Sequence, residues 1–264
     1  MSEQLLQLSG VTLGFAGNTV LQGVDFTVEA GRIASLIGPN GAGKTSLFNC
    51  ITGFYKPQQG AITFDGRAML PLKPFQVTQA GIARTFQNLR LFRGMSVLEN
   101  VMSGQHCRTK AGAIAAIFRP ASQRREEAKI EQVASECLRF VGVDAADWHR
   151  EATTLAYGHQ RRVEIARALA TEPQLLLLDE PAAGLTKSEK EELTALITSI
   201  RDERGVAVLL IEHDTGLVMS ISEKVSVLDH GVLIAEGTPV EIQNNPKVIE
   251  AYLGSEDAED ALAL

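Results

Sequence analysis

A glycine-rich segment at residues 38–45 constrains the fold of this chain more than any other feature of its sequence. It follows the apolar run Ile33 to Ile37, and apolar residues recur at helical spacing after it. This order of strand, loop and helix is that of a phosphate-binding P-loop, whose glycines let consecutive backbone N–H groups turn inward around phosphates. The segment therefore predicts a nucleotide-binding α/β domain. The predicted nucleotide-binding residues here are Gly38, Pro39, Asn40, Gly41, Ala42, Gly43, Lys44, Thr45 and Ser46.

The side chains at the end of this loop match the phosphates of ATP and a magnesium ion. Lys44 is expected to reach the β- and γ-phosphates, the Thr45 hydroxyl is a candidate Mg²⁺ ligand, and Ser46 is a candidate phosphate contact. The positive end of the following helix points at the same charge. An ordinary glycine turn is the alternative, but the strand before the loop and the helix after it argue against that interpretation. We therefore predict ATP and Mg²⁺ as cofactors.

A second apolar run, Leu175 to Leu178, ends in the acidic pair Asp179 and Glu180. Ligands of open α/β sheets bind at the carboxyl ends of the strands, so a buried strand here would deliver both carboxylates to the nucleotide. Adjacent residues of a strand point to opposite faces, so the two should act differently. We expect Asp179 to help hold Mg²⁺ and Glu180 to deprotonate the attacking water. A purely structural role is the alternative, and the P-loop elsewhere in the chain makes it less favourable.

The remaining patterns divide the chain into regions. Alternating residues Val24 to Val28 and the turn pair after Phe64 predict antiparallel strands in the first third. A helical pattern occupies about residues 88–164, and an apolar strand at 206–211 shows that a parallel sheet resumes after it. We predict a nucleotide-binding core at about 1–87 and 165–240, a helical subdomain at about 88–164, C-terminal helices at about 238–254 and an acidic flexible tail at 255–264.

The overall composition excludes several classes of function. A formal net charge of −7 argues against a protein that wraps nucleic acid, so we predict no nucleic-acid partner. Three cysteines without metal-type spacing are expected to be reduced core thiols. The apolar runs are far shorter than the roughly 18 residues of a spanning helix. The apolar stretch at 111–118 is expected to be a helix of the subdomain, and Arg161 and Arg162 are expected to lie on a solvated face.

Residues 155–162 carry a more specific resemblance. Their sequence is Leu-Ala-Tyr-Gly-His-Gln-Arg-Arg, shortly before the acidic strand. This resembles the ABC signature, usually Leu-Ser-Gly-Gly-Gln, which in that family is pressed against ATP held by another subunit. The resemblance implies that the signature residues face the partner's ATP, with Ala156 and His159 departing from the family's serine and glutamine and weakening that contact. The implied signature residues are Leu155, Ala156, Tyr157, Gly158, His159 and Gln160.

Three further positions match the same family. Gln87 corresponds to the glutamine that links Mg²⁺ and the attacking water to the helical subdomain, so the resemblance implies catalytic and metal-binding roles for it. His213 corresponds to the switch histidine at the γ-phosphate. Phe15 sits where an aromatic ring stacks on adenine. The resemblance covers Leu8 to about Gly254 and implies a P-loop NTPase (RecA-like) core with an antiparallel β subdomain and an inserted α-helical subdomain, forming one ABC ATPase domain over residues 1–254.

Within that family the chain is similar to the ATP-binding subunits of high-affinity branched-chain amino acid importers. The stretch at 83–92, the Leu-Ala-Tyr-Gly signature, the segment at 179–185 and the ending at 251–254 carry this similarity, whereas Thr186 stands where the family often has Asn or Asp. The resemblance implies ATP hydrolysis that powers import, at the cytoplasmic face of the membrane. The implied partners are transmembrane permease subunits, a second ATP-binding subunit and, indirectly, a solute-binding protein. We hypothesise a heterodimer of ATPases, and a homodimer stays open.

Two alternatives to this interpretation stay open. One is an ATPase of another ABC system, for a lipid or another solute such as urea, amides or aromatic acids, and the membrane partner would discriminate it. The other is a nucleotide-switched binding module that does not hydrolyse ATP. Glu180, Gln87 and His213 argue against the second alternative, and a turnover assay on the assembled complex would discriminate it.

Overall fold

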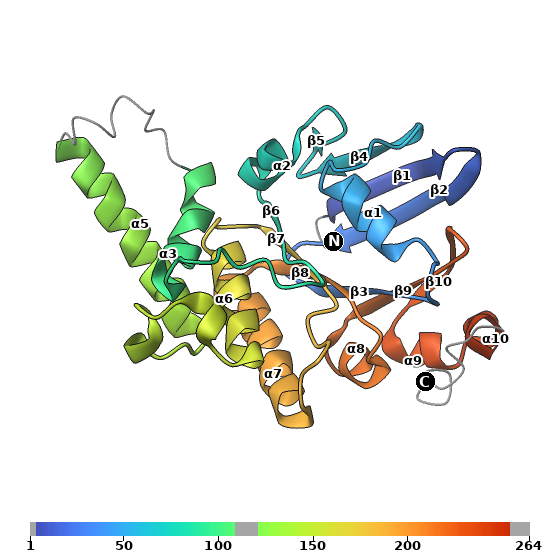
Figure 1. The fold of residues 1–264 in the computed structure, drawn as a ribbon. Coiled ribbons are helices and arrows are strands. Elements are labelled where there is room, and N and C mark those ends of the chain that lie inside the picture. The colour runs from blue at the N-terminus through green and yellow to red at the C-terminus, as the bar shows by residue number, and fades with distance from the viewer. Residues whose placement is uncertain (1–3, 109–120, 254–264) are drawn as a thin grey trace.

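The computed structural model describes residues 4–108 and 121–253 and shows an α/β architecture of two sheets and a helical layer (Figure 1). The predicted acidic tail at 255–264 and the apolar stretch at 111–118 lie outside the described residues. No helix within the described part of the chain combines the length and apolar content needed to cross a membrane.

The first sheet is antiparallel and comes from the N-terminal part of the chain. Its four strands run in the order β2-β1-β4-β5, and the turn at Asp65 and Gly66 joins the last two as the sequence predicts. Their apolar side chains alternate with polar ones, so one face of the sheet is buried. The strands are β1 (Gln4–Phe15), β2 (Asn18–Glu29), β4 (Gln59–Phe64) and β5 (Arg67–Ala68).

The second sheet has six strands in the order β10-β9-β3-β8-β7-β6. All neighbouring pairs are parallel except β9 and β10, which form an antiparallel pair at one edge. The strands are β3 (Ile33–Ile37), β6 (Ile82–Arg84), β7 (Leu175–Asp179), β8 (Ala207–Ile211), β9 (Lys224–Asp229) and β10 (Val232–Gly237).

Strands β3, β7 and β8 are buried on both faces, as their continuous apolar runs predict. Alternate residues enter two different cores: Leu176 packs with the helical side and Leu177 with the antiparallel sheet. Helix α1 (Lys44–Ile51) lies between the two sheets and contributes Phe48 to the second of these cores. The P-loop helix is thus held from both sides by apolar packing.

The helical layer lies beside the parallel sheet, at its β6–β7 end, and shares one apolar core with residues of β7 and β8 (Figure 1). It consists of α3 (Val97–Met102), α5 (Ala121–Phe140) and α6 (Tyr157–Leu169), with short 3₁₀ turns at Ser103–Cys107, Ala145–Asp147 and Ala152–Thr154. Helix α6 crosses the boundary that the sequence pattern places near residue 164 and packs on the sheet with Ile165 and Leu169. The helical layer and the sheet therefore share one continuous helix.

The other helices flank the sheets. Helix α7 is an 18-residue helix whose N-cap is Thr186, and Gly205 ends it in a left-handed conformation. Helix α9 begins with a capping box formed by Thr238 and Glu241. The bounds of these helices are α2 (Pro74–Ala80), α7 (Lys187–Arg204), α8 (Thr215–Ile221), α9 (Pro239–Gln243) and α10 (Pro246–Leu253).

This topology brings four functional segments together. Strands β3, β8, β7 and β6 are neighbours in the parallel sheet, so their carboxyl ends meet at one edge. The P-loop follows β3, His213 follows β8 closely, Asp179 ends β7, and Gln87 lies three residues after β6. This is the edge at which open α/β sheets bind ligands.

Candidate nucleotide-binding site

The P-loop glycines are required by close backbone approach. Gly38 has a φ of 146°, and a Cβ there would lie 1.9 Å from the carbonyl oxygen of Leu228 in β9. Gly43 has a φ of 107°, and its Cβ would lie 3.0 Å from the Val20 carbonyl oxygen. Any larger residue at Gly38 would collide with the backbone of Leu228, which is part of strand β9. The loop conformation is therefore fixed by contacts outside the loop.

Lys44 lies inside the curve of this loop, at the start of α1. Its side chain is buried, and Nζ donates hydrogen bonds to the carbonyl oxygens of Gly38 and Pro39, the latter at 3.0 Å. Thr45 is exposed and Ser46 is half-buried beside it. A pocket at this point is lined by both hydroxyl residues and also by Glu180 and His213. The predicted phosphate-binding side chains thus border one cavity together with Glu180 and His213, whereas Gln87 does not line it.

Glu180 lies at the mouth of that pocket in an unusual backbone conformation. Its φ is 49°, in the left-handed region that non-glycine residues rarely adopt, and its backbone N–H donates to the Ile211 carbonyl at 2.9 Å. Its carboxylate accepts a hydrogen bond from Gln87 Nε2 at 2.6 Å and lies 3.1 Å from His213 Nε2. The three predicted catalytic residues therefore form one connected cluster. Such local strain is characteristic of functional sites.

Asp179 is held differently, although it precedes Glu180 directly. Its Oδ2 accepts a charge-assisted hydrogen bond from Arg84 Nη2 at 2.7 Å, and both side chains are almost fully buried. Arg84 also donates to the Asn49 side chain of α1 at 2.7 Å. This arrangement links β6, β7 and the P-loop helix. The adjacent carboxylates point into different surroundings, as strand alternation predicts.

The donor set at this edge fits a magnesium ion. The Thr45 hydroxyl, the Asp179 carboxylate and the Gln87 amide all supply the hard oxygen ligands that Mg²⁺ prefers. Among the described residues no group of three or more acidic, histidine or cysteine side chains gathers into a metal cage. Mg²⁺ is characteristically held by one or two carboxylates together with substrate phosphates, so this sparse set matches it.

Glu212 is a buried residue of this site that our sequence analysis did not identify. One of its oxygens accepts the Ala182 N–H at 2.6 Å, and the other accepts the His213 N–H at 3.0 Å. The carboxylate thereby joins the loop after β7 to the loop after β8. Burial raises the pKa of the Glu212 carboxyl, although these backbone N–H groups act in the opposite direction. Its position directly before His213, at the end of an apolar strand, was the available signal.

The predicted signature residues surround the start of α6. Ala156 occupies the N-cap and supplies no side-chain bond, whereas Gln160 donates to the carbonyls of Thr153 and Leu155 at 3.2 and 2.8 Å. The Leu155 side chain is buried, and the exposed residues are Ala156, Tyr157 and His159. The N-cap side chain therefore makes no hydrogen bond to the first backbone N–H groups of α6.

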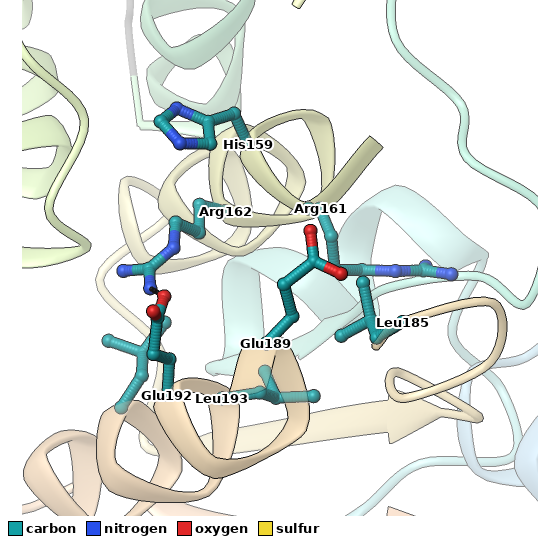
Figure 2. A pocket seen from close by; sticks show the side chains of 9 residues that line it. His159, Arg161, Arg162, Leu185, Glu189, Glu192 and Leu193 are labelled. Carbon is teal, nitrogen blue, oxygen red and sulfur yellow. Dashed lines mark hydrogen bonds and ion pairs between the residues drawn. The ribbon is translucent and has the colours of Figure 1, made fainter. Parts of the chain in front are cut away.

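A cleft separates the start of α6 from α7, and Figure 2 shows its lining. The Glu189 carboxylate of α7 lies against Gly158, where an added Cβ would come within 2.5 Å of its Oε1. Glu189 also completes a capping box with Thr186, whose hydroxyl and backbone N–H donate to Oε2 at 2.7 and 2.8 Å. Thr186 therefore has a helix-capping role, and a side chain at position 158 would require the flexible end of Glu189 to move.

The prediction that Arg161 lies on a solvated face is wrong. Its side chain is 1% exposed and forms an ion pair with Glu164 at 2.9 Å. Burial raises the pKa of the Glu164 carboxyl more strongly than Arg161 lowers it. Arg162 is half-buried and pairs with Glu192 across the cleft (Figure 2). Helical spacing turns the two neighbouring arginines to different sides of α6.

Phe15 lies at the end of β1 and is 46% exposed. Its ring meets Tyr55 edge to face, with centroids 5.0 Å apart. The Gln58 side chain accepts from the Gly14 N–H at 2.9 Å and donates to the Gly14 carbonyl at 3.0 Å. The segment after α1 therefore fixes the backbone before Phe15 and packs on its ring.

Comparison with known proteins agrees with this geometry. Residues 21–183 match the family described as ABC transporter, and residues 232–258 match the family described as branched-chain amino acid ATP-binding cassette transporter. The chain is similar to the high-affinity branched-chain amino acid transport ATP-binding protein BraF of Pseudomonas aeruginosa, with 46% identity over 96% of this chain and 99% of BraF. The corresponding LivG protein of Escherichia coli K12 is 44% identical over 96% and 99% of the two chains.

Solved structures show the same fold. The ADP conformation of an ATP-binding cassette of an ABC transporter has a TM-score of 0.83 and 30% identity, covering 96% of this chain and 100% of that one. A nucleotide-free ATP-binding cassette from an ABC transporter has a TM-score of 0.81 at the same identity and coverage. The predicted fold class is confirmed. The chain belongs to the ABC transporter family, as one of its ATP-binding subunits.

Proposed function

We propose that this chain hydrolyses ATP to power an importer of branched-chain amino acids at the cytoplasmic face of a membrane. The observation that carries the hydrolytic part is the Glu180 carboxylate, held between Gln87 and His213 at the mouth of the P-loop pocket. The solute class is supported by the 46% and 44% sequence identity to BraF and LivG, which extends over 96% of this chain. The geometry also supports the roles that follow for individual residues.

Binding of ATP begins at the P-loop. The backbone N–H groups of the loop and the start of α1 supply positive potential for the phosphates, and Lys44 supplies a full charge. In the structure Lys44 Nζ is bonded to the carbonyls of Gly38 and Pro39, so the loop itself directs it inward. We assign Thr45 and Ser46 to the phosphate end of the nucleotide, and Phe15 to the adenine ring.

Hydrolysis needs a base beside the γ-phosphate. Glu180 accepts the proton of the attacking water, and Gln87 and His213 orient its carboxylate oxygens from two sides. His213 is also close enough to the pocket to donate to the γ-phosphate. When bound, Mg²⁺ neutralises charge on the β- and γ-phosphates, and Thr45, Asp179 and Gln87 are its proposed protein ligands.

The start of α6 is the proposed contact with ATP on a second ATP-binding subunit. Ala156, Tyr157 and His159 are exposed at this helix N-terminus, whose positive end suits the phosphates of a nucleotide. Closure around ATP is favoured by contacts that exist only while the γ-phosphate is present, and hydrolysis removes them. Ala156 removes a hydroxyl at this surface, so we propose a heterodimer with a subunit that carries a complete signature.

Permease subunits are the proposed membrane partners, and a groove beside Gln87 is their proposed docking surface. It is lined by aromatic side chains, of which Phe75 is 57% exposed and Phe92 is 50% exposed, together with Phe86 and Arg90. Exposed aromatic side chains in a concave surface are typical of protein interfaces. A permease bound there would contact the segment that holds Gln87, which provides a route from hydrolysis to transport.

The test is reconstitution of the complex. The tagged chain should co-purify from its host with two permease subunits and a second ATPase, and a solute-binding protein should stimulate the complex. In proteoliposomes with ATP, we expect uptake of labelled leucine, isoleucine or valine that is lost in Lys44→Ala. Uptake of another solute, or transfer of lipid, would refute the substrate class alone. Absence of ATP hydrolysis by the assembled wild-type complex would refute the proposed function and favour a nucleotide-switched binding module.

A further inference from the structure

The buried guanidinium of Arg161 contacts the segment that carries Gln87. Its Nη1 donates to the Phe86 carbonyl at 2.9 Å, and its Nη2 donates to the Gln87 carbonyl at 3.1 Å. Two successive carbonyls after β6 are therefore held by one planar fork that extends from α6. Lysine could not reproduce this arrangement, because its single ammonium group lacks the fork geometry.

The same guanidinium is held on its own helix by two further contacts. Nη1 also bonds Glu164 Oε2 at 2.9 Å, one turn along α6, and Nη2 donates to the Tyr157 hydroxyl at 3.1 Å. Arg161 and Glu164 are each about 1% exposed, so the pair is isolated from water. A buried guanidinium with four polar partners has a defined position. It therefore fixes α6 relative to the segment after β6 that carries Gln87.

These contacts complete a path across one subunit. Glu180 accepts a hydrogen bond from the Gln87 side chain, the Gln87 carbonyl accepts one from Arg161, and Arg161 donates to Tyr157 in the first turn of α6. Tyr157 also lies against the loop after β7. A Cβ built on Gly184 in that loop would be 3.4 Å from the Tyr157 ring. The base at one end and the signature surface at the other are therefore joined through the Arg161 side chain.

We propose that Arg161 is a positioning residue, which binds the Phe86 and Gln87 carbonyls to the signature helix so that Gln87 orients Glu180 for hydrolysis. This inference rests on the proposed function of Glu180. Its consequence is that docking of the signature surface on a second subunit and alignment of the base are mechanically linked within each chain. Arg161 acts through Gln87 and touches no nucleotide.

Arg162 provides a matched control on the same helix. Figure 2 shows the Arg162 side chain directed to Glu192 and the Arg161 side chain directed away from it. Arg162 donates to the Val141 carbonyl at 2.7 Å and to Glu192. It therefore holds α6 to its neighbouring helices without contacting the segment of Gln87.

The test uses the assembled ATPase complex and three variants. Arg161→Lys keeps a positive charge beside Glu164 but loses the fork. The double variant Arg161→Met/Glu164→Met removes the whole buried pair, which proteins commonly tolerate in folding when both partners become apolar. Arg162→Met is the control. We expect both Arg161 variants to lower kcat for ATP about tenfold to a hundredfold with KM changed less than about threefold, and the control to keep kcat within about twofold.

A double-mutant cycle with Gln87→Ala separates positioning from general loss of structure. In the Gln87→Ala background, Arg161→Lys should lower kcat less than about twofold further, because the group through which it acts is absent. Equal losses in both backgrounds, or an Arg161→Lys enzyme with wild-type kcat, would overturn the proposal. An inactive wild-type complex would instead refute the proposed function itself, so the two failures are distinguishable.

Discussion

The bare N-cap of α6 gives a prediction whose size follows from the structure. Ala156 has the extended N-cap conformation, with φ −59° and ψ 151°, but offers no oxygen to the free N–H groups of the first turn. Ala156→Ser would supply that acceptor at an exposed position. Replacing alanine by serine at an N-cap stabilises a helix by about 1 kcal/mol, within a range of about 0.5–2 kcal/mol. For a chain of this size that corresponds to a rise in Tm of about 2–4 °C.

The assay is thermal unfolding of the isolated chain, followed by turnover of the assembled complex. Ala156→Val adds volume without an acceptor and should give no gain in Tm. In the complex, the serine hydroxyl would also donate to ATP on the facing subunit, and a bond to a charged acceptor corresponds to about tenfold or more in rate. An unchanged Tm would refute the capping argument. A raised Tm with unchanged turnover would show that the hydroxyl does not face nucleotide, and would remove the basis for the proposed heterodimer.

Three further predictions concern the P-loop, the ring beside Phe15 and the capping boxes. Gly38→Ala should abolish ATP binding and strongly lower Tm because its Cβ would collide with the Leu228 carbonyl, whereas Gly41→Ala, with free space around it, should cost only about 1–2 kcal/mol of backbone strain. Tyr55→Ala should weaken ATP binding measured by calorimetry but leave tripolyphosphate binding unchanged, because it supports only the proposed adenine platform. Replacing three capping-box glutamates by glutamine should make Tm decrease less steeply as the pH is lowered. The backbone N–H of each N-cap lowers the pKa of these carboxyls below the usual glutamate value, so their stabilisation is fully present above that usual pKa and is lost as the pH falls through the lowered pKa. These residues are Glu99, Glu189 and Glu241.

The elements near the nucleotide site were predictable because their signals are local. The glycine spacing of the P-loop and the apolar run of β7 each depend on neighbouring residues, and the structure has a loop and a buried strand at these positions as predicted. The parallel order of β3, β8 and β7 then brings Lys44 and Glu180 to one pocket. The two residues meet because parallel strands place their carboxyl ends at one edge of the sheet, and an alternation of strands and helices in the sequence leaves few other topologies.

The charged residues behind the site were not predictable from local pattern. Arg161 looked like a solvated residue because adjacent arginines usually face water, and its partners Phe86 and Gln87 lie more than seventy positions away in the chain. The pairing of Arg84 with Asp179 spans an even longer interval of sequence. Buried arginine requires distant carbonyls or carboxylates to compensate its desolvation, and no single-sequence periodicity records where these lie.

The measurement that tests the account most directly is the effect of Glu180→Gln on the assembled ATPase. The amide keeps the shape of the carboxylate but cannot accept the proton of the attacking water. We predict that ATP binding stays within about threefold of wild type and that kcat for hydrolysis falls by about 10²- to 10⁴-fold. A long-lived ATP-bound complex should then be detected by size-exclusion chromatography. Normal turnover in this variant would contradict the assignment of Glu180 as the base, with His213 as the next candidate.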